Sequence, residues 1–184
     1  MIGLESGIVK LAPHMAVWFQ LFAEEKSCLA AAVGPHILDI QHVGSTAIPG
    51  IPAKPIIDIA IAVANFEAAH VCIAPIEQLG YLYRGEYGLP RRHYFVKGNP
   101  RTHHLHMNEI SSQDWQNQIL FRDYLRQHPE VAQTYAALKT RLAGQYEQDR
   151  ERYLQEKAPF IEEVLRLAAL SEGGGVNEHS EQYN

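Results

Sequence analysis

The residue types best suited to chemistry gather in one segment, HVGSTAIPGIPAKPIIDIAIAV, which runs from His42 to Val63. The Gly44-Ser45 pair follows an apolar run and predicts a turn at the end of a strand. Glycine lets an anion approach the backbone closely, and turn N–H groups together with the Ser45 hydroxyl can donate hydrogen bonds to a phosphate. Asp58 interrupts the β-branched strand that follows, where an unpaired charge is costly. The segment therefore predicts a phosphate-holding turn beside a strand carboxylate.

Each of these features has a second interpretation. Asp58 could hold a metal ion between the protein and a nucleotide triphosphate, or it could pair with a neighbouring cation. Lys54 is the nearest such cation in sequence, and it could equally reach a phosphate because Pro55 restrains its backbone. The Gly44-Ser45 pair could also be a plain strand-ending turn without a ligand.

The same residues resemble the nucleotidyltransferase superfamily, in which a hydrophobic residue and Gly-Gly or Gly-Ser precede two strand acids separated by one hydrophobic residue. The chain is more closely similar to the GrpB family, nucleotidyltransferase-fold proteins of largely unassigned function. Four stretches carry this resemblance over about residues 8–170, namely GSTAIPGIPAKPIIDI from Gly44, HHLHM from His103, FRDYLRQHPEVAQTYAALK from Phe121 and YLQEKAPFI from Tyr153. It implies an α+β fold with a nucleotidyltransferase-like mixed β-sheet, an N-terminal helix and a helical C-terminal half.

The resemblance also implies roles for the residues that match. Gly44 and Ser45 would hold the phosphate of a nucleotide or another phosphorylated small molecule, and Asp58 would bind Mg²⁺ or Mn²⁺. Asp58 and Ser45 would then be the catalytic residues of a nucleotidyl transfer to an acceptor hydroxyl or phosphate. Ala60 departs from the pattern, because it occupies the position of the second strand acid. The strand alone does not supply the acids of a two-metal site.

Two readings follow from Ala60. His104 and His106 lie two apart on a predicted strand, hence on one face, and could complete a mixed site with Asp58 that favours zinc or another transition metal. The histidines could equally be ordinary hydrogen-bonding residues of a solvated strand face. Alternatively the chain is a non-catalytic accessory module that lost its metal site. Relatives occur fused to dephospho-coenzyme A kinase, so the resemblance allows a role in coenzyme A biosynthesis or protein folding.

A second basic feature lies further along the chain. Residues 84–104 contain five Lys or Arg against one Glu, and Arg91 and Arg92 could clamp a triphosphate with their planar guanidinium groups. The competing interpretation is a solvated strand edge carrying arginines.

The elements that must position these residues follow from apolar spacing. We expect helices over 13–33 and 66–79, strands over 37–43, 56–63, 92–96 and 103–107, and helices after residue 111, with one beginning or kinked at Pro159. Residues 46–55 hold three prolines and a glycine, which exclude a regular helix or central strand. We expect one domain over residues 1–170 and a disordered tail over 171–184.

Composition excludes several classes of protein. The 184 residues are 46% hydrophobic and 20% charged, which is typical of a globular domain. A formal charge of −5 argues against a protein that coats nucleic acid. The sequence lacks an apolar run of membrane-spanning length, a signal-peptide pattern and a disulfide framework, so we expect a cytoplasmic protein that does not act at a membrane.

Overall fold

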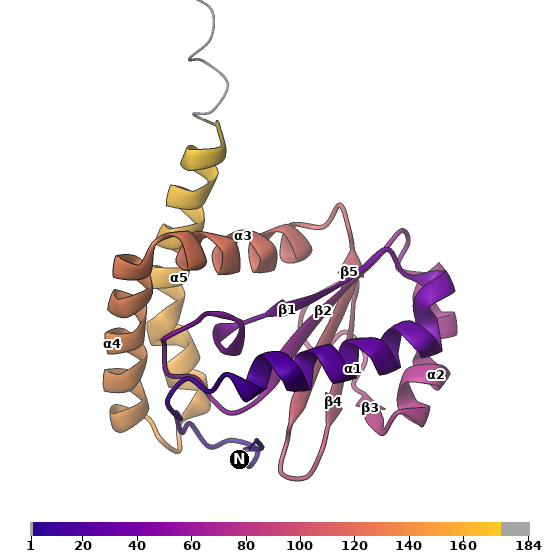
Figure 1. Cartoon of the computed structure of the whole chain (residues 1–184), viewed down its shortest axis with the longest axis horizontal. Coiled ribbons are helices and arrows are strands. Elements are labelled where there is room, and N and C mark those ends of the chain that lie inside the picture. The colour runs from indigo at the N-terminus through magenta and orange to yellow at the C-terminus, as the bar shows by residue number, and fades with distance from the viewer. Residues whose placement is uncertain (1, 174–184) are drawn as a thin grey trace, which may run out of the picture.

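A five-stranded mixed sheet forms the centre of the computed structural model, which describes residues 2–173 (Figure 1). Its strands are β1 (Asp39–Val43), β2 (Ile57–Val63), β3 (Tyr81–Tyr83), β4 (Arg92–Lys97) and β5 (His103–Glu109), in the spatial order β1-β2-β5-β4-β3. β2 and β5 are parallel, and the other neighbouring pairs are antiparallel. The predicted α+β class with a mixed sheet is confirmed.

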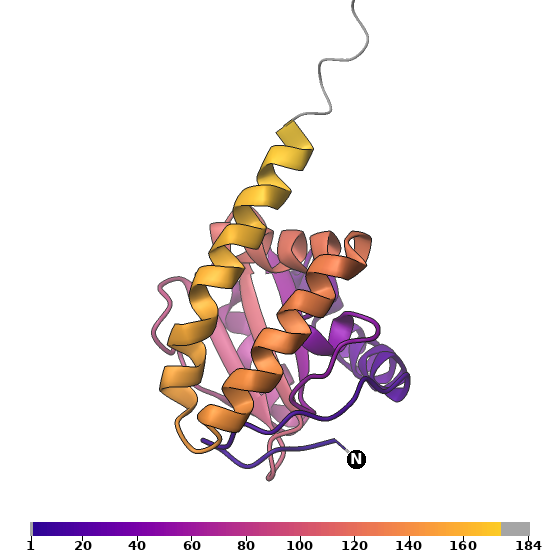
Figure 2. The ribbon, with the colours of Figure 1, turned by 90° about the vertical axis from the view of Figure 1, so that its left-hand side faces the viewer.

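Helices cover the two faces of this sheet unequally. The sequence forms α1 (Val17–Val33), α2 (Ile73–Gln78), α3 (Gln113–Gln127), α4 (Pro129–Gln145) and α5 (Arg150–Gly173). α1 and α2 pack on one face, and α3 packs on β1, β2 and β5 from the other side. α4 and α5 pass in front of the sheet in Figure 2, on the side that α3 also covers. Among residues 2–173, no helix is both long enough and apolar enough to cross a membrane.

The alternation of β2 separates these two layers. Ile57, Ile59 and Ile61 are fully buried against Trp18 and Leu29 of α1, in the main hydrophobic core. Asp58, Ala60 and Ala62 point the other way, as the period of two of a strand requires. Ala60 and Ala62 pack with Trp115 of α3, so small side chains allow this helix to approach the sheet. The position at which a second acid was expected is therefore covered by an indole ring.

The polar face of β2 continues onto the neighbouring strands β5 and β4. Asp58 lies opposite His104 in the β2–β5 register, and Tyr94 lies opposite His106 in the β4–β5 register. The intervening Leu105 faces the apolar core and is fully buried. Strand alternation thus places an acid, two histidines and a tyrosine on the sheet face that α3, α4 and α5 cover.

Several element boundaries differ from the predictions. The first helix starts at Val17 rather than residue 13, and residues 66–79 form a 3₁₀ turn (Ala68–Cys72) followed by α2 rather than one helix. β3 was not expected, since three residues are too few for an alternation to be recognised. Residues 46–55 contain no α-helix or strand, as predicted, although Ser45–Ala47 forms a 3₁₀ turn.

The C-terminal helix also differs from the prediction. α5 begins at Arg150 and contains Pro159, so this proline does not start the helix. α5 continues to Gly173, so the first three residues of the expected tail are helical, while residues 174–184 of that tail lie outside the described residues.

The packing of Ala60 leads to a prediction. We expect Ala60→Asp to lower the free energy of unfolding by at least about 3 kcal/mol, because a second carboxylate would be buried beside Trp115, and burial lowers the pKa of its registered neighbour His106 to about 4, so that this histidine offers no positive charge. Urea unfolding at pH 7 measures this change. Ala30→Asp, at an exposed position of α1, is the control and should cost less than about 1 kcal/mol. A well-tolerated Ala60→Asp would show that the strand can accept the second acid.

Candidate functional site

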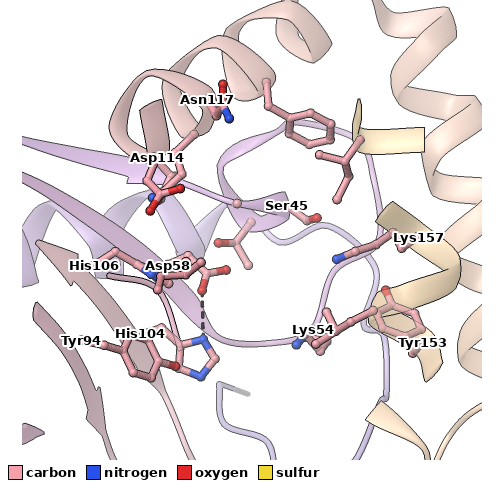
Figure 3. A pocket seen from close by; sticks show the side chains of 18 of the residues that line it. Ser45, Lys54, Asp58, Tyr94, His104, His106, Asp114, Asn117, Tyr153 and Lys157 are labelled. Carbon is pink, nitrogen blue, oxygen red and sulfur yellow. Dashed lines mark hydrogen bonds and ion pairs between the residues drawn. The ribbon is translucent and has the colours of Figure 1, made fainter. Parts of the chain in front are cut away.

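A cavity of about 690 Å³ lies between the polar face of the sheet and α3, α4 and α5 (Figure 3). Its sheet side is lined by Asp58, Tyr94, His104 and His106, with the Gly44-Ser45 turn at one edge. Its helical side contributes Asp114 and Asn117 of α3, Tyr135 and Lys139 of α4, and Tyr153 and Lys157 of α5. The cavity therefore contains most of the site residues expected from the sequence, together with helical residues that were not expected.

The Gly44-Ser45 turn depends on glycine. Gly44 has φ +68°, and a β-carbon at this position would lie 2.5 Å from Oδ2 of Asp58. An L-residue would therefore combine an unfavourable backbone conformation with a collision against the carboxylate. The turn and the strand acid, fourteen positions apart in numbering, form one closely packed unit.

Side chains from α3 hold this turn in place. Nη1 of Arg122 donates to the carbonyl of His42 (3.0 Å), and Nε of Arg126 donates to the carbonyl of Ala47 (2.9 Å). Nε2 of His42 lies 3.0 Å from Oγ1 of Thr46, behind the turn. Backbone carbonyls on both sides of Gly44 are thus fixed from a helix about 80 residues later in the chain.

Asp58 is the acidic centre of the cavity. Its Oδ1 lies 3.0 Å from Nδ1 of His104, its registered partner on β5, and the side chain is 29% exposed. Burial by itself would raise the pKa of Asp58, but the hydrogen bond with His104 and the nearby positive charges, including that of Lys54, lower it to about 2. Asp58 is therefore ionised at neutral pH, and its partner in the folded chain is a histidine rather than Lys54.

Cationic side chains surround this carboxylate. Lys54, Arg92, Lys139, Arg150 and Lys157 all line the cavity. Within the part of the chain that the structure describes, none of the five forms a salt bridge with a carboxylate. The acids that line the same cavity are Asp58 and Asp114, so five cations face two carboxylates. Among the described residues, the cavity therefore has more cationic than anionic side chains in its lining.

Burial weakens the protonation of the three lysines. It lowers the pKa of Lys54 and of Lys157 to about 8, in both cases against the opposing effect of Asp58. Burial, together with the neighbouring charges of Lys157 and Lys54, lowers the pKa of Lys139 to about 7. The ammonium of Lys139 donates to the carbonyl of Pro52. In Figure 3 the ammonium groups of Lys54 and Lys157 point into the space beside Asp58.

The two arginines that were expected to form a phosphate clamp, Arg91 and Arg92, lie in different places. Arg92 lines the cavity, and its Nη2 donates to the carbonyls of Tyr87 (2.9 Å) and Glu86 (3.1 Å). Arg91 does not line it, and its exposed guanidinium instead pairs with Glu67 and Glu109, each at 2.8 Å. The expected clamp of Arg91 with Arg92 is therefore not assembled, because Arg91 lies in the turn before β4 with φ +60° and its side chain leaves the cavity.

The other cations of the basic stretch over residues 84–104 also lie outside the cavity lining. Of its five cations, only Arg92 lines the cavity, while Lys97, for example, pairs with Glu25 of α1 at 2.8 Å. The positive charge of the cavity comes mainly from the helical half of the chain and from Lys54.

The predicted mixed metal site of Asp58, His104 and His106 stays a prediction, although the three side chains line the same cavity. Across residues 2–173, no group of three or more His, Cys, Asp or Glu side chains is placed to hold an ion. Nδ1 of His104 is used by Asp58, and Nδ1 of His106 lies 3.4 Å from Nη1 of Arg92. Mg²⁺ usually takes one or two carboxylates and completes its shell with waters and ligand phosphates. The donor set around Asp58 suits such a phosphate-completed ion better than an all-protein zinc site.

Helical residues of the cavity were missed in the sequence. The stripes of α4 and α5 predict core, and Tyr135 and Tyr153 are indeed buried, yet both line the cavity as well. Lys139 could have indicated the cavity, because it is four residues after Tyr135 and therefore lies on the buried apolar stripe of α4. A lysine on an apolar helix face needs a polar destination, and here that destination is the cavity.

The contact of Gly44 with Asp58 generates a second prediction. Gly44→Ala should lower the free energy of unfolding by about 2 kcal/mol more than Gly50→Ala, because both glycines have positive φ but only Gly44 faces a carboxylate. Urea unfolding of the two variants measures this difference. Equal losses in the two variants would contradict the close packing of the turn on Asp58.

Comparison with known proteins identifies relatives of this chain. The model of the family described as "GrpB protein" matches residues 8–167. The chain is 44% identical over 154 residues to the "UPF0157 protein YqkA" of Bacillus subtilis, covering 83% of this chain but only 45% of the relative, so the chain spans about half of that protein. It is 27% identical to a "Dephospho-CoA kinase" of Mycolicibacterium paratuberculosis, over 87% of this chain and 46% of that protein.

A solved structure agrees with the fold. The crystal structure of the conserved protein GrpB from Enterococcus faecalis superposes with a TM-score of 0.83 at 33% sequence identity. The superposition covers 89% of this chain and 99% of that one. Together with the family match over most of its length, this shows that the chain belongs to the GrpB family.

Proposed function

We propose that this chain binds a phosphorylated small molecule, such as a nucleotide, in the cavity between the sheet and α3, α4 and α5. The observation that carries the proposal is the group of five cavity-lining cations without a carboxylate partner among the described residues. Burial lowers the pKa of the three lysines among them, so their charged form is costly. An anionic ligand stabilises that charged form. A phosphate supplies such a negative charge.

The individual residues have distinct parts in this proposal. Gly44 and Ser45 would lie against one phosphate, Lys54 and Lys157 would neutralise its charge, and Arg92 would shape the opposite edge. Asp58 would hold Mg²⁺ or Mn²⁺, which supplies charge neutralisation and orients the phosphate. Asp114 of α3 is a second carboxylate in the same cavity.

As a more specific proposal, the fold would be nucleotidyltransferase-like and the reaction would be nucleotidyl transfer. The turn beside a strand acid matches the superfamily pattern, and an ordered phosphate between cations is how such a site lowers a transfer barrier. Ala60, buried under Trp115, argues against the two-metal form of that chemistry. Binding of the phosphorylated ligand is accordingly the primary function that we propose.

A non-catalytic accessory role is the second candidate. Two observations favour it, namely the missing second strand acid and the similarity to a protein named dephospho-CoA kinase. In this role the cavity would bind a coenzyme A precursor, which also carries phosphate, without a metal ion.

Ligand screening by thermal shift tests the primary proposal. ATP or inorganic tripolyphosphate, each with Mg²⁺ or Mn²⁺, should raise Tm, because a ligand that binds only the folded state stabilises it. Lys157→Met should weaken binding about 10-fold or more, since it removes a buried cation. Lys26→Met, at an exposed position of α1, is the matched control and should leave binding unchanged.

The metal arm separates the two candidates. Loss of the Mg²⁺- or Mn²⁺-dependent part of the shift in Asp58→Asn supports the metal role of this residue. Stabilisation by dephospho-coenzyme A without added metal supports the accessory role instead. No shift with any of these compounds contradicts both candidates.

Proton uptake on binding is a further expected outcome. Without a ligand, Lys54 and Lys157 are about half protonated at pH 8 and Lys139 is mostly neutral, given pKa values of about 8, 8 and 7. A bound phosphate favours the charged lysines and raises these values, so binding takes up protons near pH 8. Calorimetric titration of tripolyphosphate in buffers of different ionisation enthalpy measures this uptake, which should vanish below about pH 6. Proton release at pH 8 would contradict the lysine assignment.

A further inference from the structure

We propose that the ligand carries a planar aromatic ring, which binds between α3 and α5 against Phe121, Ile161 and Leu165, while its phosphates face Lys54 and Lys157. This deepens the proposed function by naming the class of ligand, and it rests on that function.

The first observation is the composition of the helical wall. Phe121 of α3 and Ile161 and Leu165 of α5 all line the cavity and are only partly buried. Phe121 and Ile161 pack against the hydrophobic cluster that includes Tyr135 and Leu125. Their remaining exposed surface lies in the cavity, where an inorganic phosphate would leave it in contact with water. A ring bound there would remove this apolar surface from water, which is favourable.

The second observation is the geometry of the aromatic side chains behind this wall. The rings of Phe121 and Tyr135 meet edge to face, with centroids 5.3 Å apart at 82°. Tyr135 in turn stacks on Phe160 at 5.3 Å and 13°. Phe121 and Tyr135 are thus the cavity-lining members of an ordered aromatic series, and a ligand ring packed against Phe121 would continue it. Aromatic pairs of this kind are stabilised beyond the effect of the area that they bury.

The third observation is size. A cavity of about 690 Å³ falls within the range of about 300–1,000 Å³ that accommodates ligands of nucleotide size. Phosphate groups alone would occupy a small part of it. The lining of the cavity includes both the cations with Asp58 and these apolar side chains, which suits a ligand with a charged end and a ring.

The opposite rim is less suited to the ring. Tyr87 also lines the cavity and is 47% exposed, but its ring already stacks on Tyr94, with centroids 5.0 Å apart at 19°. The guanidinium of Arg84 lies 5.7 Å from the same ring. Tyr87 therefore has an aromatic and a cationic partner within the protein, whereas Phe121, among the described residues, has the aromatic partner Tyr135 and no cation over its ring.

The experiment compares two kinds of probe on the full chain by calorimetric titration with Mg²⁺. Inorganic tripolyphosphate has the charge without the ring, and the triphosphates of adenosine, guanosine, cytidine and uridine have both. At least one nucleoside triphosphate should bind about 10-fold or more tightly than tripolyphosphate. Phe121→Leu, which keeps apolar volume but removes the ring, should reduce that gain about 3- to 10-fold and leave tripolyphosphate affinity unchanged.

Two further variants guard the interpretation. Leu165→Gln alters the same wall from α5 and should also reduce the gain. Tyr124→Leu is the matched control on α3, because Tyr124 stacks on His128 and does not line the cavity. It should change neither affinity.

The outcomes separate this inference from the proposed function. Tripolyphosphate binding that is lost in Lys157→Met supports the proposed function whether or not a ring is recognised. If no nucleoside triphosphate binds more tightly than tripolyphosphate, the ring site is overturned and the phosphate site stands. The ring site is also overturned if the gain disappears in Tyr87→Leu but persists in Phe121→Leu. Absence of all binding overturns both.

Discussion

The placement of one ionised carboxylate on a covered sheet face constrains much of this structure. Asp58 sits on β2 between the backbone of Gly44 and the imidazole of His104, and its pKa is lowered to about 2. A buried negative charge of this kind is stable only where hydrogen bonds and cations compensate for lost hydration. The turn must be glycine, the facing strand must offer a donor, and the helices above must bring positive charge.

The helices satisfy this requirement and exceed it. α4 contributes Lys139, and the region from Arg150 to Lys157 of α5 contributes two more cations to a cavity that also holds Lys54 and Arg92. Asp58 and Asp114 balance only part of this charge. An anionic ligand would neutralise the remaining positive charge, so the charge of the cavity indicates the class of ligand that it would bind. Ala60 has a different role, because its small side chain allows Trp115 to pack on the adjoining part of the sheet.

Parts of this site were predictable because their signals are local. The Gly44-Ser45 pair and Asp58 stand out through backbone freedom and a charge within an apolar strand, and the structure brings them into contact. His104 was predictable as a neighbour of Asp58 only in the sense that both lie on sheet strands; its pairing with Asp58 follows from the parallel β2–β5 register. The Arg91–Arg92 clamp does not form, and local charge density could not show that Arg91 lies in the turn before β4 with a positive φ. Arg91 went to Glu67 and Glu109 instead.

The sequence alone determined the α+β class, the two-sided pattern of β2, the glycine turn and the absence of a second acid at Ala60. These properties depend on residue type and on spacing within a few positions, so they can be read without knowing the fold. Tertiary structure decided which cations surround Asp58, because Lys139 and Lys157 lie far along the chain and reach the cavity only through the packing of α4 and α5 on α3. It also decided that Arg122 and Arg126 hold the turn by its carbonyls. Such long-range contacts depend on how helices cross the sheet, which no local pattern specifies.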